Sequence, residues 1–268
     1  MLIIDRPLIM GILNVTPDSF SDGGQFFDPE AALRHAMEMT EAGADIIDIG
    51  AESTRPGAGA VAMEEEWQRV EPVLRGLRKS IGKPVSIDTH KAEIARRSVA
   101  EGADIINDIS GLTFDPEMAE VAAEADVPVV IMHIKGTPRD MQKHPTYENL
   151  MEEITAFFER QTKYAISSGI AKIILDPGLG FGKRFEDNYE LIRRLGEFRA
   201  FGFPLLAGPS RKSFIGRVAG NTPLDKMLGT GAACAMAVSN GGHILRVHDV
   251  DEIQRIVKVS EAVRKNKA

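Results

Sequence analysis

Short runs of apolar residues recur along this sequence, and most of them end in a polar side chain that is capable of chemistry. Apolar runs of about four to eight residues, rich in Ile and Val, are typical of buried strands. The polar residues at the ends of these runs are Asn14, Glu52 to Arg55, Asp88, Asn107, His133, Asp176, the turn Ser210 to Lys212, Arg246 and His248. Each residue alone could have an ordinary structural role, such as a helix cap for Asp88. Separate roles of this kind would not, however, place polar residues at the end of nearly every apolar run. We therefore expect them to meet in one site.

Three of these side chains suit the recognition of a flat heterocycle. Asp88, Asp176 and the amide of Asn107 can accept hydrogen bonds from a row of N–H donors, because a carboxylate takes paired donors in its own plane. Apolar residues near them in the sequence, which could pack against the faces of such a ring, are Ile109, Met132 and Phe181.

A second group of side chains suits an anion with several oxygens, such as a phosphate or pyrophosphate. Its members are Arg246, His248, Asn14 and Arg55. The formal net charge is −7, so an anion must be held by a local group of this kind rather than by the overall field. The sequence has no cluster of Asp and Glu dense enough to enclose a metal. We therefore expect Mg²⁺ held by one protein oxygen together with phosphate and water.

The elements that must position these groups alternate between strand and helix. The expected strands are 7–13, 46–49, 84–88, 104–108, 128–133, 172–176, 204–208 and 243–247. The expected helices are 29–42, 63–80, 91–101, 116–125, 147–168, 187–201, helices across 212–240, and 250–265. Eight strand-plus-helix units, and a repeated glycine-to-strand segment beginning at Gly43 and at Gly102, favour an α/β fold with one (β/α)8 TIM barrel domain over residues 1–268. In such a barrel the site forms at the C-terminal face of the strands.

Composition narrows the class of protein. The chain has 268 residues, of which 43% are hydrophobic and 26% charged, as in a soluble globular protein. The acidic balance does not favour nucleic acid or an anionic membrane as a partner. A single cysteine, Cys234, allows no internal disulfide, and no secretory leader or long apolar span is recognisable. We expect a cytoplasmic protein that acts on small molecules.

Together, the motifs at the strand ends resemble those of dihydropteroate synthase. They are N-V-T-P-D-S-F-S-D-G-G from Asn14, E-S-T-R-P-G from Glu52, S-I-D-T from Ser86, I-N-D-I-S-G from Ile106, M-H at Met132, D-P-G-L-G-F-G-K from Asp176, G-P-S-R-K-S-F from Gly208 and R-V-H-D-V from Arg246. They run from the first expected strand to the last in the family's order, and jointly they are highly specific.

The resemblance implies a reaction of folate biosynthesis. The family joins 6-hydroxymethyl-7,8-dihydropterin pyrophosphate to p-aminobenzoate, giving 7,8-dihydropteroate and pyrophosphate by an SN1-like displacement. Carried onto this sequence, the pterin would contact Asp88, Asn107, Asp176, Lys212, Arg246, Met132 and Phe181, with Asp88, Lys212 and Arg246 in the catalytic role. The residues p-aminobenzoate would contact are Phe20, Thr54, Arg55, Pro56, Phe181 and Ser213. Pyrophosphate would contact Asn14, Thr54, Arg55, Arg246 and His248, and Asn14 would bind Mg²⁺.

Two other functions remain open at this stage. A methyltetrahydrofolate-binding methyltransferase shares the barrel and the Asp and Asn pterin site, but has no need for Thr54 to Pro56 or for Ser210 to Lys212. A non-catalytic pterin-binding paralogue would be expected to have lost Arg246 or His248. The family resemblance also implies a homodimer, with the C-terminal helices as its interface.

The loops 16–26 and 53–62 lack the apolar periodicity that would dock them firmly. We expect both to be open without ligand and to order around pyrophosphate and Mg²⁺, so that p-aminobenzoate binds after the pterin substrate.

Overall fold

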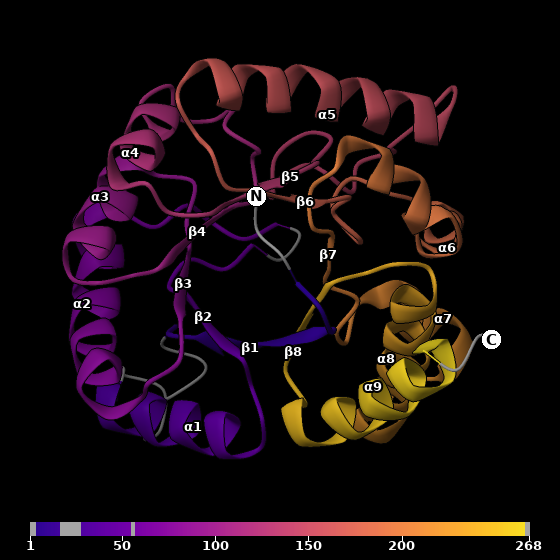
Figure 1. The fold of residues 1–268 in the computed structure, drawn as a ribbon, viewed down its shortest axis with the longest axis horizontal. Helices are drawn as coiled ribbons and strands as arrows, with labels where there is room; N and C mark the ends of the chain where they lie inside the picture. Colours follow the sequence, from indigo (N-terminus) through magenta and orange to yellow (C-terminus); the bar gives the residue numbers. More distant parts are fainter. Residues whose placement is uncertain (1–3, 17–27, 55–56, 266–268) are drawn as a thin grey trace.

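A computed structural model describes residues 4–16, 28–54 and 57–265 of the chain (Figure 1). Parallel strands form a ring in the middle of the molecule, and helices surround it. The strands are β1 (Leu8–Asn14), β2 (Ile46–Gly50), β3 (Val85–Asp88), β4 (Ile105–Asp108), β5 (Val129–Met132), β6 (Ile173–Asp176), β7 (Leu206–Ala207) and β8 (Ile244–Val247). The helices are α1 (Pro29–Glu41), α2 (Met63–Ser80), α3 (Ala92–Ala100), α4 (Met118–Ala125), α5 (Leu150–Ser167), α6 (Phe185–Arg194), α7 (Ser213–Ala219), α8 (Pro223–Ser239) and α9 (Val250–Lys265).

The strand order confirms the expected (β/α)8 barrel. Neighbouring strands follow the order β6-β5-β4-β3-β2-β1-β8-β7, and every pair is parallel. An isolated parallel bridge between Leu175 and Leu205 joins β6 to the start of β7 and closes the ring. Closure removes the free sheet edges, so the strands are buried on both faces and their sequences are nearly continuous apolar runs.

The core has two layers and a small third cluster. One layer lies between the strands and the surrounding helices. The other fills the interior of the barrel and takes one buried residue from each of seven strands, namely Met10, Ile46, Ile105, Val130, Ile174, Leu206 and Ile244. The third cluster contains Ile109, Met132, Met141 and Phe181, which follow or end the strands β4, β5 and β6. The interior of the barrel is therefore packed at the level of Met10 and Ile46.

Two expected helices differ from the observed ones. Residues 187–201 are not one α-helix, because α6 ends at Arg194 and a 3₁₀ helix follows over Leu195–Phe201. The segment 212–240 contains more than one helix, as expected, and divides at Gly220, whose φ of 105° an L-residue adopts only with strain; Thr222 then caps α8 by accepting from Asp225 N–H. Residues 147–149 stay outside α5 because the Asn149 side chain caps it, accepting from Glu152 N–H at 3.3 Å.

None of the described helices is both long enough and apolar enough to cross a membrane.

Candidate active site

The alternation of side chains along the strands builds the site directly above the apolar interior. Successive residues of a strand point to opposite faces, so a residue two positions after an interior one is again interior. Two residues after Ile46, Ile105, Ile174 and Ile244 come Asp48, Asn107, Asp176 and Arg246. Each of these pairs steps from a buried isoleucine to a polar group one layer closer to the C-terminal face of the barrel. The strands therefore carry an apolar floor and a polar layer above it.

Arg246 is the centre of this polar layer. Its Nε donates to Asp48 Oδ2 at 2.6 Å, and one terminal nitrogen donates to Asp88 Oδ2 at 2.5 Å. Asn107 Nδ2 donates to the same Asp48 oxygen at 3.1 Å. Burial raises the pKa of Asp88, although the Arg246 guanidinium opposes that rise. Four strands, β2, β3, β4 and β8, thus contribute to one continuous hydrogen-bonded group.

Asp176 and Lys212 lie on the other side of the mouth. One oxygen of Asp176 accepts from Gly178 N–H at 2.7 Å, and burial raises the pKa of this carboxyl. The Lys212 ammonium donates to the carbonyl of Leu179 and lies over the Phe181 ring, 4.5 Å from its centroid. Burial lowers the pKa of Lys212 to about 7. Asp176 is one of the charged groups that oppose this shift, so the two groups interact electrostatically.

The three apolar residues expected to hold a ring are brought together. Ile109, Met132 and Phe181 belong to one buried cluster with Met141. Each lies one residue after a strand, at its last residue, or in the loop that follows it. The cluster is beside Asp176 and Lys212, since Met132 pairs with Asp176 in the β5–β6 register and Phe181 lies under the Lys212 ammonium.

Asn14 ends β1, and His248 directly follows the neighbouring strand β8. Asn14 ends β1 opposite Gly50, and a Cβ added to Gly50 would lie 3.8 Å from Asn14 Oδ1 and 3.5 Å from Asp88 Oδ2. Gly50 therefore leaves space between an amide oxygen and a carboxylate. His248 Nδ1 lies 2.9 Å from Ser210 Oγ, and that oxygen also accepts from His248 N–H at 3.1 Å. The hydroxyl therefore fixes the position of His248.

The remaining expected residues lie after β2, at the start of α7, or outside the described residues. Thr54 is half-buried in the loop after β2, and Ser213 is the exposed first residue of α7. Phe20, Arg55 and Pro56 fall outside the described residues, as does most of the loop 16–26.

Comparison with known proteins agrees with this arrangement. A family model described as "Pterin binding enzyme" matches residues 10–248. A dihydropteroate synthase of Synechocystis is 48% identical over 261 residues, covering 96% of this chain and 90% of the relative. The structure of Yersinia pestis dihydropteroate synthase with a sulfonamide drug complex has a TM-score of 0.93 at 44% identity, covering 99% of this chain and 97% of that one. Dihydropteroate synthase from Xanthomonas albilineans in complex with 7,8-dihydropteroate has a TM-score of 0.87 at 40% identity, covering 98% and 95%.

The chain belongs to the dihydropteroate synthase family. The identity extends over nearly the whole length of both proteins, and these relatives are named as synthases, which decides against the methyltransferase alternative.

Two buried residues of this dihydropteroate synthase-family site were not among the polar residues that the sequence predicts at the ends of strands. The first is Asp48, which is fully buried. It lies within β2, two residues before the end of that strand. A charged residue inside an otherwise apolar strand could have predicted it, because buried charges are nearly always paired.

The second is Lys183, which is 3% exposed at the end of the glycine-rich segment after β6. Its ammonium lies 2.9 Å from His133 Nδ1 and donates to the carbonyls of Gly178 and Phe181 at 3.0 and 2.9 Å. Burial, and then the charge of Lys183, lower the pKa of His133 to about 2. Lys183 therefore shapes the loop that carries Phe181.

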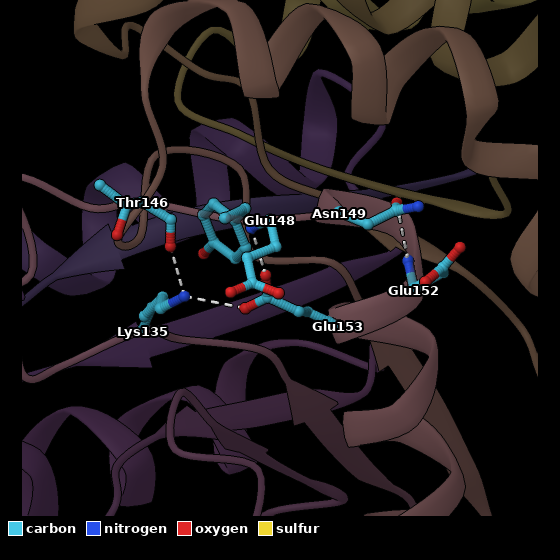
Figure 2. A pocket seen from close by; sticks show the side chains of 7 residues that line it. Lys135, Thr146, Glu148, Asn149, Glu152 and Glu153 are labelled. Carbon is cyan, nitrogen blue, oxygen red and sulfur yellow. Dashed lines mark hydrogen bonds and ion pairs between the residues drawn. The ribbon is translucent and has the colours of Figure 1, made fainter.

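A pocket of about 420 Å³ lies beside this mouth, between the segment after β5 and the start of α5 (Figure 2). Lys135 lies at its base, where it pairs with Glu153 at 2.8 Å and lies 4.1 Å from the centroid of the Tyr147 ring. Tyr147 donates to the carbonyl of Gly182 at 2.6 Å, so the pocket wall supports the loop after β6 from outside. The lining residues share no side chain with the group around Arg246.

Proposed function

We propose that the mouth of the barrel is the place where this chain makes 7,8-dihydropteroate. The chain is a transferase of folate biosynthesis, which condenses 6-hydroxymethyl-7,8-dihydropterin pyrophosphate with p-aminobenzoate and releases pyrophosphate. The observation that carries the assignment is the group formed by Asp48, Asp88, Asn107 and Arg246, which faces Asp176 and Lys212 above an apolar floor. Hydrogen-bond acceptors, a guanidinium and apolar surface are together what a flat, donor-rich ring next to a diphosphate requires.

The pterin ring occupies the side of the mouth next to β4, β5 and β6. Asp176 accepts from the ring's N–H donors through the oxygen that Gly178 does not use. Asn107 and Asp88 accept at the neighbouring edge, and Lys212 donates to the ring carbonyl. Met132 and Phe181 pack against the ring, with the Arg246 guanidinium along its other face.

The pyrophosphate lies between β1 and β8. Arg246 lies on β8 and His248 directly follows that strand, Asn14 ends β1, and Thr54 lies in the loop after β2. Arg55, which lies outside the described residues, is a further contact by family resemblance. The described residues contain no group of three or more His, Cys, Asp and Glu that could hold a metal, so an all-protein cage is not offered there. An amide oxygen such as Asn14 Oδ1 is a suitable single ligand for Mg²⁺, which otherwise binds phosphate oxygens and water. Bound in this way, Mg²⁺ would supply charge that offsets the charge of the leaving pyrophosphate.

The bond between the pterin methylene carbon and the pyrophosphate oxygen breaks first, and its electron pair leaves with the oxygen. The carbon becomes cationic, and the charge spreads into the ring. Asp88, held by Arg246 at 2.5 Å, is preorganised to stabilise that charge without taking a proton. The amine of p-aminobenzoate then forms the new C–N bond with its lone pair and releases a proton to solvent.

p-Aminobenzoate binds at the rim of the mouth, against Phe181, near Thr54 and beside Ser213 at the start of α7. Phe20, Arg55 and Pro56, which lie outside the described residues, are its further contacts by family resemblance. The N-terminal N–H groups of α7 lie next to Lys212, and the carboxylate of p-aminobenzoate is attracted to them. The substrate order expected from the sequence, with p-aminobenzoate second, is retained in this proposal.

The molecule works as a cytoplasmic homodimer in this proposal. Large apolar side chains that are more than half exposed gather on three C-terminal helices, namely Val218 on α7, Leu224, Leu228 and Met236 on α8, and Val259 and Val263 on α9. The helices α8 and α9 lie side by side on one flank of the barrel (Figure 1). Exposed apolar side chains gathered in this way are typical of a protein interface. The single cysteine is buried, which is compatible with a reducing compartment.

Calorimetry with inorganic pyrophosphate tests the anion site. Pyrophosphate should bind the wild-type protein with Mg²⁺ present and at least roughly tenfold more weakly with a chelator. Arg246→Ala and His248→Ala should each reduce the affinity by a similar factor, because a charged partner of the anion is lost. Arg75→Ala, which removes a surface ion pair with Glu101, is the matched control. Equal affinities with Mg²⁺ and with chelator would remove the metal from the mechanism.

A further inference from the structure

Asp48 is a completely buried carboxylate that contacts two side chains of the proposed pterin site. Its Oδ2 accepts from Arg246 Nε at 2.6 Å and from Asn107 Nδ2 at 3.1 Å. Its other oxygen, Oδ1, has no hydrogen-bond partner among the residues that the structure describes. A buried carboxylate that uses one oxygen for two neighbouring side chains holds both of them at fixed distances from each other.

The contact with Asp48 determines which way round the Asn107 amide lies. An ionised carboxylate only accepts hydrogen bonds, so the amide must turn its NH₂ group toward Asp48. The opposite orientation would place the amide oxygen against a carboxylate oxygen in a buried site, which is repulsive. The amide oxygen of Asn107 is thereby left as the atom available to a ligand. Asp48 thus converts a side chain that can either donate or accept into an acceptor.

The same carboxylate restrains Arg246. The guanidinium is held through Nε by Asp48 and through one terminal nitrogen by Asp88, on two different strands. Two anchors fix the plane of the guanidinium as well as its position. Its remaining N–H groups are then directed at a set angle to the ring and the anion.

We infer that Asp48 is a positioning residue that makes the pterin site selective for a ring edge rich in N–H donors. The inference rests on the proposed function, since it assigns the selectivity to the same mouth. Asn107 is held as an acceptor by Asp48, and the second oxygen of Asp176, beside the one bound to Gly178, has no hydrogen-bond partner in the described part of the chain. A ring edge that carries an amino group and a ring N–H satisfies both acceptors. A ring edge with a carbonyl in place of the amino group would instead place an oxygen lone pair against the acceptor oxygens of Asn107 and Asp176, which is repulsive.

Binding of two ligands that differ only at this edge tests the inference. The probes are 6-hydroxymethylpterin, with its 2-amino group, and the analogue with oxygen in place of that group. Calorimetry gives the ratio of their affinities for each protein. The wild-type protein should favour the amino compound at least roughly 100-fold, because buried acceptors would be left facing a carbonyl. In Asp48→Ala the amide of Asn107 is free to turn, and the ratio should fall by about tenfold.

Two further variants separate positioning from a loss of structure. Asp48→Asn keeps an oxygen where Oδ2 accepts both bonds, so its ratio should stay within about threefold of wild type. Ser86→Ala is the matched control, because Ser86 is the buried register partner of Asp48 on β3 and makes no contact with Arg246 or Asn107 in the described hydrogen bonds.

The inference is overturned by an Asp48→Ala protein with the wild-type ratio, or by an Asp48→Asn protein whose ratio collapses. Should Asp48→Ala not fold, Asp48→Val, which also removes the acceptor but suits a strand, should show the same fall in the ratio. A wild-type protein that binds neither compound would instead overturn the proposed function.

Discussion

The carboxylates of this site are buried, so the charge and orientation of each depend on the few groups that contact it. Asp176 is 5% exposed, and its described hydrogen bond is the one from Gly178 N–H. Asp48 and Asp88 share one guanidinium. Three carboxylates therefore lie among three basic groups, Arg246, Lys212 and Lys183, so charges of opposite sign are paired around the mouth. Asp88 is the carboxylate that the mechanism uses to stabilise the charge on the pterin methylene.

Replacing Asp176 by Asn should separate ligand binding from folding. The amide oxygen of Asn can still accept from Gly178 N–H, so the thermal midpoint should change little. The other end of the amide becomes a donor and opposes the N–H groups of the pterin. Losing a buried charged acceptor costs about 2–5 kcal/mol, so pterin affinity measured by calorimetry should fall at least roughly 30-fold. Unchanged pterin affinity would show that Asp176 is not the anchor.

His133 makes stability depend on pH just below neutrality. Burial holds its pKa at about 2, so the folded protein keeps it neutral while the unfolded chain takes up a proton below its ordinary value of about 6.5. The stabilisation is therefore complete above pH 6.5 and is lost as the pH falls toward 2. Relative to His133→Asn, which keeps an acceptor for Lys183, the wild-type free energy of unfolding should fall by about 1.4 kcal/mol for each pH unit below 6.5.

Urea unfolding at pH 7 and pH 5.5 measures this difference. His144→Asn, at an exposed position with φ of 56° where Asn is tolerated, should behave as wild type. An identical pH dependence in wild type and His133→Asn would refute the assignment.

At the scale of elements, one lysine joins both ends of the loop between β2 and α2. The Lys91 ammonium donates to the Glu52 carboxylate just after β2, to the Glu66 carboxylate on α2 at 2.5 Å, and to the carbonyl of Val61 at 2.7 Å. Glu66 is 1% exposed and also accepts from Thr89. The loop that carries Thr54 is therefore fastened at its base to the start of α3.

Lys91→Met should raise the KM for p-aminobenzoate more than the KM for the pterin substrate. The loop loses its anchor, so KM for p-aminobenzoate should rise at least roughly tenfold while KM for the pterin substrate stays within about threefold. Stability should fall by about 3 kcal/mol, because Glu66 is left buried without its cation. Steady-state kinetics at a permissive temperature, with Lys172→Met as a surface control, provide the comparison. Equal changes in both KM values would mean that the loop is not specific to p-aminobenzoate.

The strands and most helices could be predicted from the sequence because a closed parallel barrel buries its strands on both faces. The bounds of a short strand could not be predicted as well, since a strand was expected over 204–208 and β7 spans only Leu206–Ala207. The break after α6 lies at a tertiary contact with the residue after α8, since Asn240 Nδ2 donates to the carbonyl of Ile192 at 2.8 Å and a Cβ on Gly196 would lie 2.9 Å from the Asn240 carbonyl oxygen. Such a contact leaves no local pattern in the sequence.

The site was predictable to the extent that its residues end strands. Asp88, Asn107, Asp176, Lys212 and Arg246 meet at the mouth as expected. Asp48 was not found because it lies within β2 and does not end a strand. Only the alternation of side chains along the strand, with Ile46 facing the interior two residues earlier, indicates that it points into the barrel. Lys183 was not found because most of its partners are backbone carbonyls, which every sequence has, and its side-chain partner, His133, lies 50 residues away in the sequence.

At the scale of the whole molecule, the apolar flank of α7, α8 and α9 should hold two copies together. Leu228→Glu combined with Val259→Glu places two charges on side chains that are 55% and 66% exposed. Sedimentation should then show a monomer where the wild type is a dimer, because buried unpaired charge opposes association. Ile166→Glu, at a 58% exposed position on α5, should remain dimeric. A wild-type monomer at micromolar concentration would contradict the proposal.

The most direct test of the account is a steady-state assay with both substrates, comparing wild type with Asp88→Asn. The wild-type protein should form 7,8-dihydropteroate and an equal amount of pyrophosphate, and only when both substrates are present. Asp88→Asn should lower kcat at least roughly 100-fold with small changes in both KM values, because the carboxylate acts on charge that develops in the transition state. No dihydropteroate from the wild-type protein, or a wild-type kcat in Asp88→Asn, would contradict the account.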